Sequence, residues 1–496
     1  MMKRITFFAL ILLPVFAFGQ VKKYDAKWES LDSRPAPSWF EDAKFGIFIH
    51  WGPYSVPAWT PKGVYEEWYQ YWLTTKKAAG NFNPKPSSVY DHHVNKYGEN
   101  FSYYNFGKMF KAEDFKPEEW AKLFSDAGAK YMVITSKHHD GFALWPSKEA
   151  DKSWGFPWNS VSTGPKRDLI GDLAKEVKKT DVKFGLYYSL YEWYNTLYQN
   201  DTQKYVNQHY LPQIKDLVTS YQPDVLWADG DWEMSSAKWK SEEFLAWLYN
   251  DSPVKDRVIV NDRWGLDSRH KHGGYYTTEY GASAEFSKPW EECRGIGISF
   301  GYNRNEDYWD YNSAQTLVLL LADVVSHGGN LLLDIGPDDT GKIPPIMQER
   351  LLQIGEWLKK NGEAIYGTRK WKNPVQWSNG TIVEGREYKK NNNLRYLGGD
   401  FILKQTVNPD PGMAVKEIFF TKKGNTLFAI LPKMPEKPII IKEIPVTPST
   451  VVTLIGLDRK LKWEKDGDGI VVTIPALSIN EIPFQNAYVL KIADIK

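Results

Sequence analysis

The stretch Val225-Leu226-Trp227-Ala228-Asp229-Gly230 is an apolar run that ends on a carboxylate and then on a turn residue. Such a run predicts a buried strand that carries Asp229 to the mouth of a sheet. About fifty residues later, Tyr275-Tyr276-Thr277-Thr278 ends in the same way, on Glu279. Two carboxylates at the carboxyl ends of separate strands are the minimum that glycosidic bond cleavage requires. A single Asp or Glu is more often a cap or an ion-pair partner, so the other strand ends must be compared.

Short apolar runs alternate with longer, partly helical segments from about residue 40 to residue 365. Helical spacing of apolar residues is clear in 117–127, 168–179, 313–326 and 346–360. This alternation predicts an α/β fold with a parallel (β/α)8 barrel of the TIM type. The segments 264–274 and 280–295 are too short for full crossover helices, so we expect the barrel to be irregular. The eight expected strands are 45–50, 131–137, 182–188, 224–229, 257–262, 275–279, 296–300 and 330–335.

The chain becomes β-rich after about residue 368. Turn residues such as Gly424-Asn425 separate short runs at 426–431, 438–442, 451–455, 469–474 and 487–492. These runs predict a C-terminal antiparallel β-sandwich of roughly 125 residues. We find no cluster of His, Cys or carboxylate residues in it, so we expect it to brace the barrel, with independent sugar binding as the alternative.

The first nineteen residues are typical of a cleavable export signal. Lys3 and Arg4 precede an apolar run from Ile5 to Phe18, and Ala17-Phe18-Gly19 resembles a cleavage site. The run is shorter than the roughly 20 residues that a membrane span needs. We therefore expect a periplasmic or secreted protein with no membrane insertion after signal removal. The expected divisions are a signal peptide at 1–19, a catalytic barrel at 20–367 and a β-sandwich at 368–496.

Composition narrows the classes of partner. The chain has 62 Lys and Arg against 61 Asp and Glu, so nothing indicates nucleic acid. Aromatic residues make up 15% of it, which suits stacking on sugar rings as well as a large core. Cys293 is the only cysteine, so no internal disulfide can form, and we expect a buried structural thiol rather than a nucleophile.

Polar and aromatic side chains gather at the carboxyl end of one expected strand after another. Barrels of this kind carry their active sites at that end. Because side chains alternate along a strand, Trp227 and Asp229 share one side of theirs, and Phe48 and His50 share one side of another. A purely structural barrel has little reason to show this pattern. The strand ends carry His50 and Trp51, His138 to Asp140, Tyr187 and Tyr188, Asp229, Asp262 to Trp264, Glu279, and Ser299 to Tyr302.

The cluster His138-His139-Asp140 raises the question of a metal site. Adjacent residues of a strand point to opposite faces, and the chain lacks the His-Glu-x-x-His and paired-cysteine spacings of common zinc sites. Neutral imidazoles that hydrogen-bond to sugar hydroxyls fit the sequence better. We therefore expect no metal and no organic cofactor.

The strand ends lie within longer motifs of distinctive sequence. These are FGIFIHWGPYSVPA at 45–58, EWY at 67–69, KHHDGF at 137–142, GPKRDL at 164–169, FGLYYS at 184–189, LWAD at 226–229, NDRW at 261–264, TEY at 278–280, RGIGISFGYN at 294–303 and GGNLLL at 328–333. Together they resemble the α-L-fucosidases of glycoside hydrolase family 29. The resemblance runs in the family's order from about Lys44 to Tyr366, and the β-rich tail also fits it.

The resemblance implies roles for individual residues. Asp229 matches the nucleophile and Glu279 the general acid/base, with Glu291 as the nearest rival for the second role and Glu285 behind it. The implied sugar contacts are His50, Glu67, Trp68, His138, His139, Tyr187, Trp227 and Arg263. The implied lining around the C6 methyl group of fucose is Phe48, Tyr65 and Phe300.

The resulting hypothesis is a secreted retaining exo-α-L-fucosidase. It would remove terminal α-L-fucose from fucosylated oligosaccharides or glycoconjugates by double displacement. One alternative is an exo-glycosidase for an L-galactose-configured sugar, which has a hydroxyl at C6. The other is a catalytically silent fucose-binding protein, against which the presence of both carboxylates argues. The linkage, the aglycone and the oligomeric state stay open.

Overall fold

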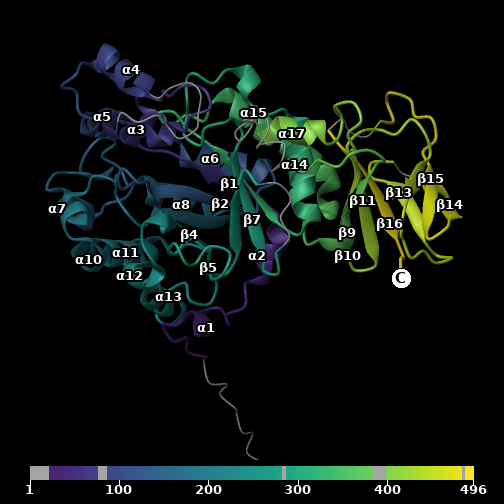
Figure 1. Ribbon diagram of the computed structural model, residues 1–496, viewed down its shortest axis with the longest axis horizontal. Helices are drawn as coiled ribbons and strands as arrows, with labels where there is room; N and C mark the ends of the chain where they lie inside the picture. Colours follow the sequence, from purple (N-terminus) through teal and green to yellow (C-terminus); the bar gives the residue numbers. More distant parts are fainter. Residues whose placement is uncertain (1–21, 76–86, 282–285, 384–397, 458, 483–485) are drawn as a thin grey trace, which may run out of the picture.

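The computed structural model describes residues 22–75, 87–281, 286–383, 398–457, 459–482 and 486–496 (Figure 1). The expected export signal at 1–19 and the rival Glu285 lie outside these residues. Strands β1 to β8 and their helices form the larger body, and the later strands form a second body beside it (Figure 1). In the part of the chain that is described, no helix has the length and apolar character of a membrane span.

Eight parallel strands form one curled sheet in the order β5-β4-β3-β2-β1-β8-β7-β6. This order is that of a TIM-like barrel left open between β5 and β6, so the predicted α/β class and irregular barrel are confirmed. The strands are β1 Phe45–Ile49, β2 Tyr131–Lys137, β3 Lys183–Ser189, β4 Val225–Asp229, β5 Ile259–Val260, β6 Tyr276–Glu279, β7 Trp290–Gly295 and β8 Asn330–Ile335.

The opening between β5 and β6 is bridged by side chains. On the side away from the opening, Asn261, just past the two-residue strand β5, extends the pairing with β4: it accepts from the Ala228 N–H at 3.1 Å and donates to the Ala228 carbonyl at 2.8 Å. Asp262 Oδ1 accepts from the backbone N–H of Thr277 on β6 at 3.1 Å and from its hydroxyl at 2.7 Å. These bonds satisfy backbone groups that would otherwise lack a strand partner, so the barrel keeps its shape without a closed ladder.

The predicted seventh strand at 296–300 is wrong, because β7 spans Trp290–Gly295. The sequence of β7 contains three charged residues and is therefore typical of a surface segment. In the structure these charges are buried, and Arg294 Nε lies 3.3 Å from Glu292 Oε1. Residues 296–300 form the loop that follows β7, and this loop brings Phe300 to the barrel end.

Helices cover the outside of the barrel (Figure 1). The described residues between β5 and β6, and between β6 and β7, contain no helix, as the short connectors predict. The longer helices are α4 Ser87–Tyr97, α6 Pro117–Asp126, α8 Leu169–Val177, α11 Leu211–Tyr221, α13 Ser241–Asn250, α14 Ala314–Ser326 and α15 Pro345–Asn361. The shorter ones are α1 Trp28–Leu31, α2 Ser38–Ala43, α3 Tyr69–Thr75, α5 Tyr104–Met109, α7 Lys148–Trp154, α9 Thr196–Asn200, α10 Thr202–Tyr205, α12 Ser236–Trp239 and α17 Gly398–Lys404.

The C-terminal body contains two antiparallel sheets, in the orders β13-β16-β11-β10-β9 and β12-β15-β14. Apolar side chains from both sheets, such as Ile418 and Ile470, share one buried core. Lys416 Nζ on β10 lies 2.7 Å from Asp323 Oδ1 on α14, which ties this body to the barrel. The strands are β9 Arg369–Trp377, β10 Lys416–Lys423, β11 Thr426–Leu431, β12 Ile439–Ile441, β13 Val451–Leu454, β14 Lys462–Asp466, β15 Gly469–Thr473 and β16 Tyr488–Ala493.

Candidate active site

A pocket of ≈ 250 Å³ opens at the carboxyl ends of the barrel strands. Every site residue expected from the sequence lines it, although these residues follow many different strands. The lining is Phe48, His50, Tyr65, Glu67, Trp68, His138, His139, Tyr187, Trp227, Asp229, Arg263, Glu279 and Phe300, together with Trp232 and Cys293.

Asp229 is the last residue of β4, and both of its carboxylate oxygens accept hydrogen bonds. Arg263 Nη1 donates to Oδ1 at 2.9 Å, and the Tyr187 hydroxyl donates to Oδ2 at 2.9 Å. Burial and the nearby Asp229 charge raise the pKa of Tyr187 well above its usual value, so the hydroxyl keeps its proton. Burial opposes the charge of Arg263, but the facing Asp229 carboxylate outweighs it and raises the Arg263 pKa. The Asp229 carboxylate is therefore fixed in orientation beside a permanent positive charge.

Glu279 ends β6 at the mouth of the pocket. Its side chain is 31% exposed, against 11% for Asp229. The Tyr65 hydroxyl donates to Glu279 Oε1 at 2.9 Å, and Arg263 Nη2 lies 3.6 Å from Oε2. The next residue, Tyr280, has a left-handed backbone with φ 47°, which ends the strand sharply. One guanidinium thus contacts both carboxylates, the buried Asp229 and the more exposed Glu279.

His138 and His139 both line the pocket, so the expectation that neighbouring residues point to opposite faces is wrong here. Strand alternation does not apply, because β2 ends at Lys137. Burial lowers the pKa of His50, His138 and His139 well below the usual histidine value, and the neighbouring imidazoles add to this effect. The three rings are therefore neutral at neutral pH.

The hydrogen bonds of His139 define which of its ring nitrogens carries the proton. The Ser189 hydroxyl donates to the Tyr191 carbonyl at 2.6 Å, so its oxygen accepts from His139 Nδ1 at 2.6 Å. A neutral imidazole has one N–H, and the other nitrogen is an acceptor. His139 Nε2, 3.5 Å from Asp229 Oδ2, therefore presents a lone pair to the pocket.

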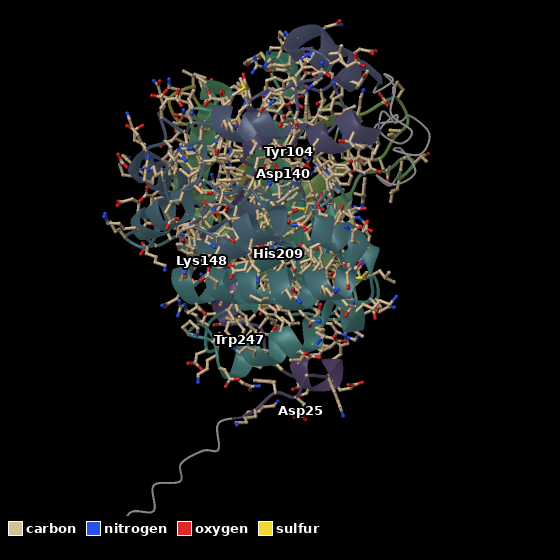
Figure 2. All side chains as sticks on the ribbon, turned by 90° about the vertical axis from the view of Figure 1, so that its left-hand side faces the viewer. Asp25, Tyr104, Asp140, Lys148, His209 and Trp247 are labelled. Carbon is tan, nitrogen blue, oxygen red and sulfur yellow. The ribbon has the colours of Figure 1, made fainter. Side chains whose placement is uncertain are left out.

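A fully buried ion cluster lies next to these histidines. Lys137 Nζ lies 2.9 Å from Glu192 Oε1, and His209 Nε2 lies 2.6 Å from the same oxygen. Burial opposes the Glu192 charge, but His209 and Lys137 outweigh it and lower its pKa to about 2. Figure 2 shows His209 and Asp140 on the same side of the molecule. The cluster compensates the Lys137 charge and holds the segment that carries the pocket histidines.

Glu67 joins the loop after β1 to the loop after β7. Its Oε2 accepts from the Gly301 N–H at 2.9 Å and from the Ser299 hydroxyl at 3.3 Å. Burial raises the pKa of Glu67 to about 7, and these two hydrogen bonds limit the rise. Glu67 therefore gains or loses a proton close to neutral pH, inside the pocket wall.

One side of the pocket is built from aromatic rings. The Phe300 ring centroid lies 5.4 Å from that of Tyr65 and 6.5 Å from that of Phe48. Phe48 and Phe300 are almost fully buried. This side offers an apolar surface to whatever enters the pocket.

Glu291, the rival to Glu279, lies inside the barrel among aromatic side chains and not in the pocket lining. Its Oε1 accepts from Trp227 Nε1 at 2.8 Å, and its Oε2 accepts from the Tyr131 hydroxyl at 2.6 Å. Burial raises the Glu291 pKa to about 7. Both oxygens are occupied by ring donors, so Glu291 supports Trp227 from below.

Two lining residues were not expected as site residues. Trp232 lies three positions after Asp229. An aromatic residue just past a strand that ends on a carboxylate is the sequence feature that could have identified it. Cys293 is a free, buried thiol, as expected, but its Sγ also lies 4.0 Å from Arg263 Nη2. Cys293 lies on β7, which the sequence did not predict to be a strand, so its place in the pocket was not expected.

Comparisons with known proteins identify the family of the chain. The family model described as alpha-L-fucosidase matches residues 13–363, and the alpha-L-fucosidase C-terminal domain model matches residues 413–493. The chain belongs to the α-L-fucosidase family. It is thus a glycoside hydrolase, and fucosylated glycans are the substrates of that activity.

Individual α-L-fucosidases match over nearly the whole chain. The human tissue α-L-fucosidase is 40% identical over 96% of this chain and 93% of its own length. The α-L-fucosidase of Branchiostoma floridae is 39% identical over 98% of this chain and 99% of its own length. The crystal structure of the Thermotoga maritima α-fucosidase, 37% identical, covers 95% of this chain and 100% of that chain with a TM-score of 0.76.

Buried carboxyl groups around the barrel end make the stability of the fold depend on pH. Burial raises the pKa of Glu67, Asp140 and Glu291 to about 7 and that of Glu306 to about 8. Above the ordinary carboxyl pKa, the folded chain therefore binds more protons than the unfolded chain, and the free energy of unfolding falls as pH rises. Histidines with lowered pKa values act in the opposite direction, but only below about pH 6.5.

We therefore expect the thermal unfolding midpoint to fall between about pH 6.5 and 7.5. Glu306→Gln should weaken this slope, because the amide oxygen can still accept from the backbone N–H groups of Ser299 and Ile298 but cannot ionise. Differential scanning calorimetry across the pH range measures both slopes. A midpoint that rises over this interval in the wild type would contradict the prediction.

Proposed function

We propose that this chain is a secreted retaining exo-α-L-fucosidase, with Asp229 as nucleophile and Glu279 as general acid/base. The observation that carries the proposal is the shared contact of Arg263 with a buried carboxylate, Asp229, and a carboxylate at the mouth, Glu279. Retaining glycosidases need two carboxyl groups close together, one for each of these roles. The fixed orientation of Asp229 suits attack on a single carbon.

In the first step an Asp229 oxygen attacks the anomeric carbon, and the bond from that carbon to the glycosidic oxygen breaks. Glu279 gives its proton to the departing oxygen, and a fucosyl ester forms on Asp229. In the second step Glu279 takes a proton from water, and the water oxygen displaces the ester. Asp229 is released as a carboxylate and Glu279 is protonated again. Arg263 stabilises the carboxylate forms throughout.

The other lining residues bind the sugar in this proposal. The lone pair of His139 Nε2 accepts a hydrogen bond from a sugar hydroxyl. The neutral imidazoles of His50 and His138 form hydrogen bonds with other hydroxyls of the same sugar. Glu67, Trp68 and Trp227 complete the polar and flat surfaces, and no metal or organic cofactor takes part. The Thermotoga maritima relative has been solved with fucose and with a mechanism-based inhibitor.

The aromatic side of the pocket would contact the C6 methyl group of fucose. Phe48, Tyr65 and Phe300 supply this apolar surface. An apolar pocket rejects an added hydroxyl by only about a hundredfold. The preference for α-L-fucosides over α-L-galactosides is therefore clear but finite.

Glu279 rather than Glu291 takes the acid/base role. The leaving group must exit through the mouth, where Glu279 is partly exposed, whereas Glu291 is buried under Trp227.

The proposed divisions of the chain are 1–19 for an export signal, 20–367 for the catalytic barrel and 368–496 for a bracing C-terminal domain. The Lys416–Asp323 ion pair supports the bracing role.

Double displacement predicts retention at the anomeric carbon. Freshly released sugar should appear as α-L-fucose and only later equilibrate with the β-anomer. Proton NMR of an α-L-fucoside during the first turnovers measures this order. First appearance of the β-anomer would exclude a covalent ester on Asp229, and absence of any turnover would favour a fucose-binding protein.

A further inference from the structure

We propose that Trp232 is the stacking platform for the leaving sugar, so that the mouth of the pocket contains an aglycone subsite for a neutral hexopyranose. The inference rests on the proposed function, because the acid at Glu279 defines where the leaving oxygen lies. Trp232 is 40% exposed, whereas the pocket floor, including Trp227 at 2%, is buried. Trp232 and Glu279 thus mark the same open end of one pocket.

The backbone directs Trp232 back over the pocket immediately after the nucleophile. Gly230 has φ 84°, and a Cβ at this position would lie 2.4 Å from the Tyr191 ring, so the turn requires glycine. Asp231 then forms a two-pronged ion pair with Arg269, at 2.7 and 3.1 Å. The turn and the ion pair hold the short helix Asp231–Glu233, and with it Trp232, in a fixed place.

Trp232 is the outer member of a row of indole rings. The Trp72 and Trp68 ring centroids are 5.5 Å apart with planes at 27°, and Trp68 and Trp232 are 6.3 Å apart with planes at 25°. The rings of His139 and Tyr191 contact Trp232 edge-on, at 5.5 and 5.8 Å. These contacts fix the ring while leaving part of its surface open to solvent.

A sugar ring fits this surface. Its axial C–H groups form a flat apolar face that can cover an indole, while its hydroxyls stay in water. Of the charged groups near Trp232, Arg269 pairs with Asp231 and Arg263 with Asp229, while Glu233 beside Trp232 and Glu279 in the same pocket lining add negative charge. A sugar acid would be repelled there, so the surface suits a neutral ring such as a galactose or an N-acetylglucosamine.

The test compares two leaving groups in the same fucose pocket. One substrate is an α-L-fucosyl galactoside or N-acetylglucosaminide that the wild type hydrolyses, and the other is α-L-fucosyl fluoride, which has no aglycone ring. For Trp232→Leu, which keeps apolar bulk but no flat ring, the ratio of the two kcat/KM values should fall about tenfold, the scale of losing one ring stack. Trp232→Phe should restore most of the ratio. Trp309→Ala, which removes an 87% exposed indole outside the pocket lining, should leave it unchanged.

Equal losses on both substrates would overturn the proposal, because they would mean that Trp232 only shapes the fucose pocket through Trp68. An unchanged ratio in Trp232→Leu would overturn it as well. If the wild type hydrolysed neither substrate, the proposed function itself would fail, and this outcome is distinct from the other two. Trp232→Ala is a second variant, and it should also lower the ratio of the two kcat/KM values.

Discussion

Asp229→Gly is expected to lower kcat/KM on an aryl α-L-fucoside by about 10⁴-fold, the scale of removing one member of a catalytic unit. The loss arises because the proposed sugar ester forms on the Asp229 carboxylate, which Arg263 and Tyr187 hold in one orientation. Azide fits the space left by the carboxylate, and it should attack from that side and yield the β-L-fucosyl azide. Product identity by NMR and the azide dependence of the rate measure the effect.

A matched control is Asp231→Asn, which neutralises a buried acid two positions away that pairs with Arg269. This variant should form no fucosyl azide, because Asp229 is still present. If Asp229→Gly kept a substantial rate, or if azide gave the α-anomer there, the nucleophile would be another residue. Removing Asp229 takes away the closer of the two carboxylates that contact the buried Arg263, and the 3.6 Å contact to Glu279 remains. The substitution can therefore lower stability as well as activity, and a calorimetric scan of the variant separates the two effects.

Glu279→Ala is expected to lower kcat/KM by about 10²- to 10⁴-fold on substrates with a sugar leaving group, the range of general acid catalysis. The loss should be much smaller on an activated aryl fucoside, because its leaving group needs no proton. The ester on Asp229 still forms in this variant, so azide should replace water in the second step. The product should then be the α-L-fucosyl azide, identified by NMR.

Glu291→Gln is the discriminating control for this assignment. The amide can still accept from Trp227 Nε1 or the Tyr131 hydroxyl, so its effect should not depend on the leaving group. We expect no azide product from it. Near-normal rates in Glu279→Ala, combined with azide rescue in Glu291→Gln, would move the acid/base role to Glu291.

Much of the candidate site could be predicted because strand ends can be recognised in a sequence. An apolar run followed by Asp229 or by His50 indicates which residue reaches the carboxyl end of its strand. In a parallel barrel all such ends meet on one face, so the residues can be grouped without knowing any distance. Where a strand end carries several such residues, the pocket lining includes part of the group and leaves out the rest, as with His50 but not Trp51, and Arg263 but not Asp262.

The errors have a common cause, which is that charge and alternation were interpreted locally. Trp290–Gly295 is a strand despite its charges, because the barrel interior supplies donors for Glu291 and because Arg294 pairs with Glu292 of the same strand. His138 and His139 share the pocket because both lie beyond β2, which ends at Lys137 as the sequence predicts, so the alternation of a strand does not extend to them. The local pattern around Glu291 does not contain Trp227 and Tyr131, the partners that make its burial possible.

Periodicity and order along the chain by themselves determined the fold class and the residues at the strand ends, and the resemblance to a known family added the expected roles of the two carboxylates and of the side chains around them. Only the tertiary structure decided that Glu279 lies at the mouth and Glu291 inside, that Asp262 bridges the open barrel, and that Trp232 lies at the exit. The physical reason is that burial, hydrogen-bond partners and exposure arise from contacts between residues far apart in the chain, and no stretch of sequence contains both partners.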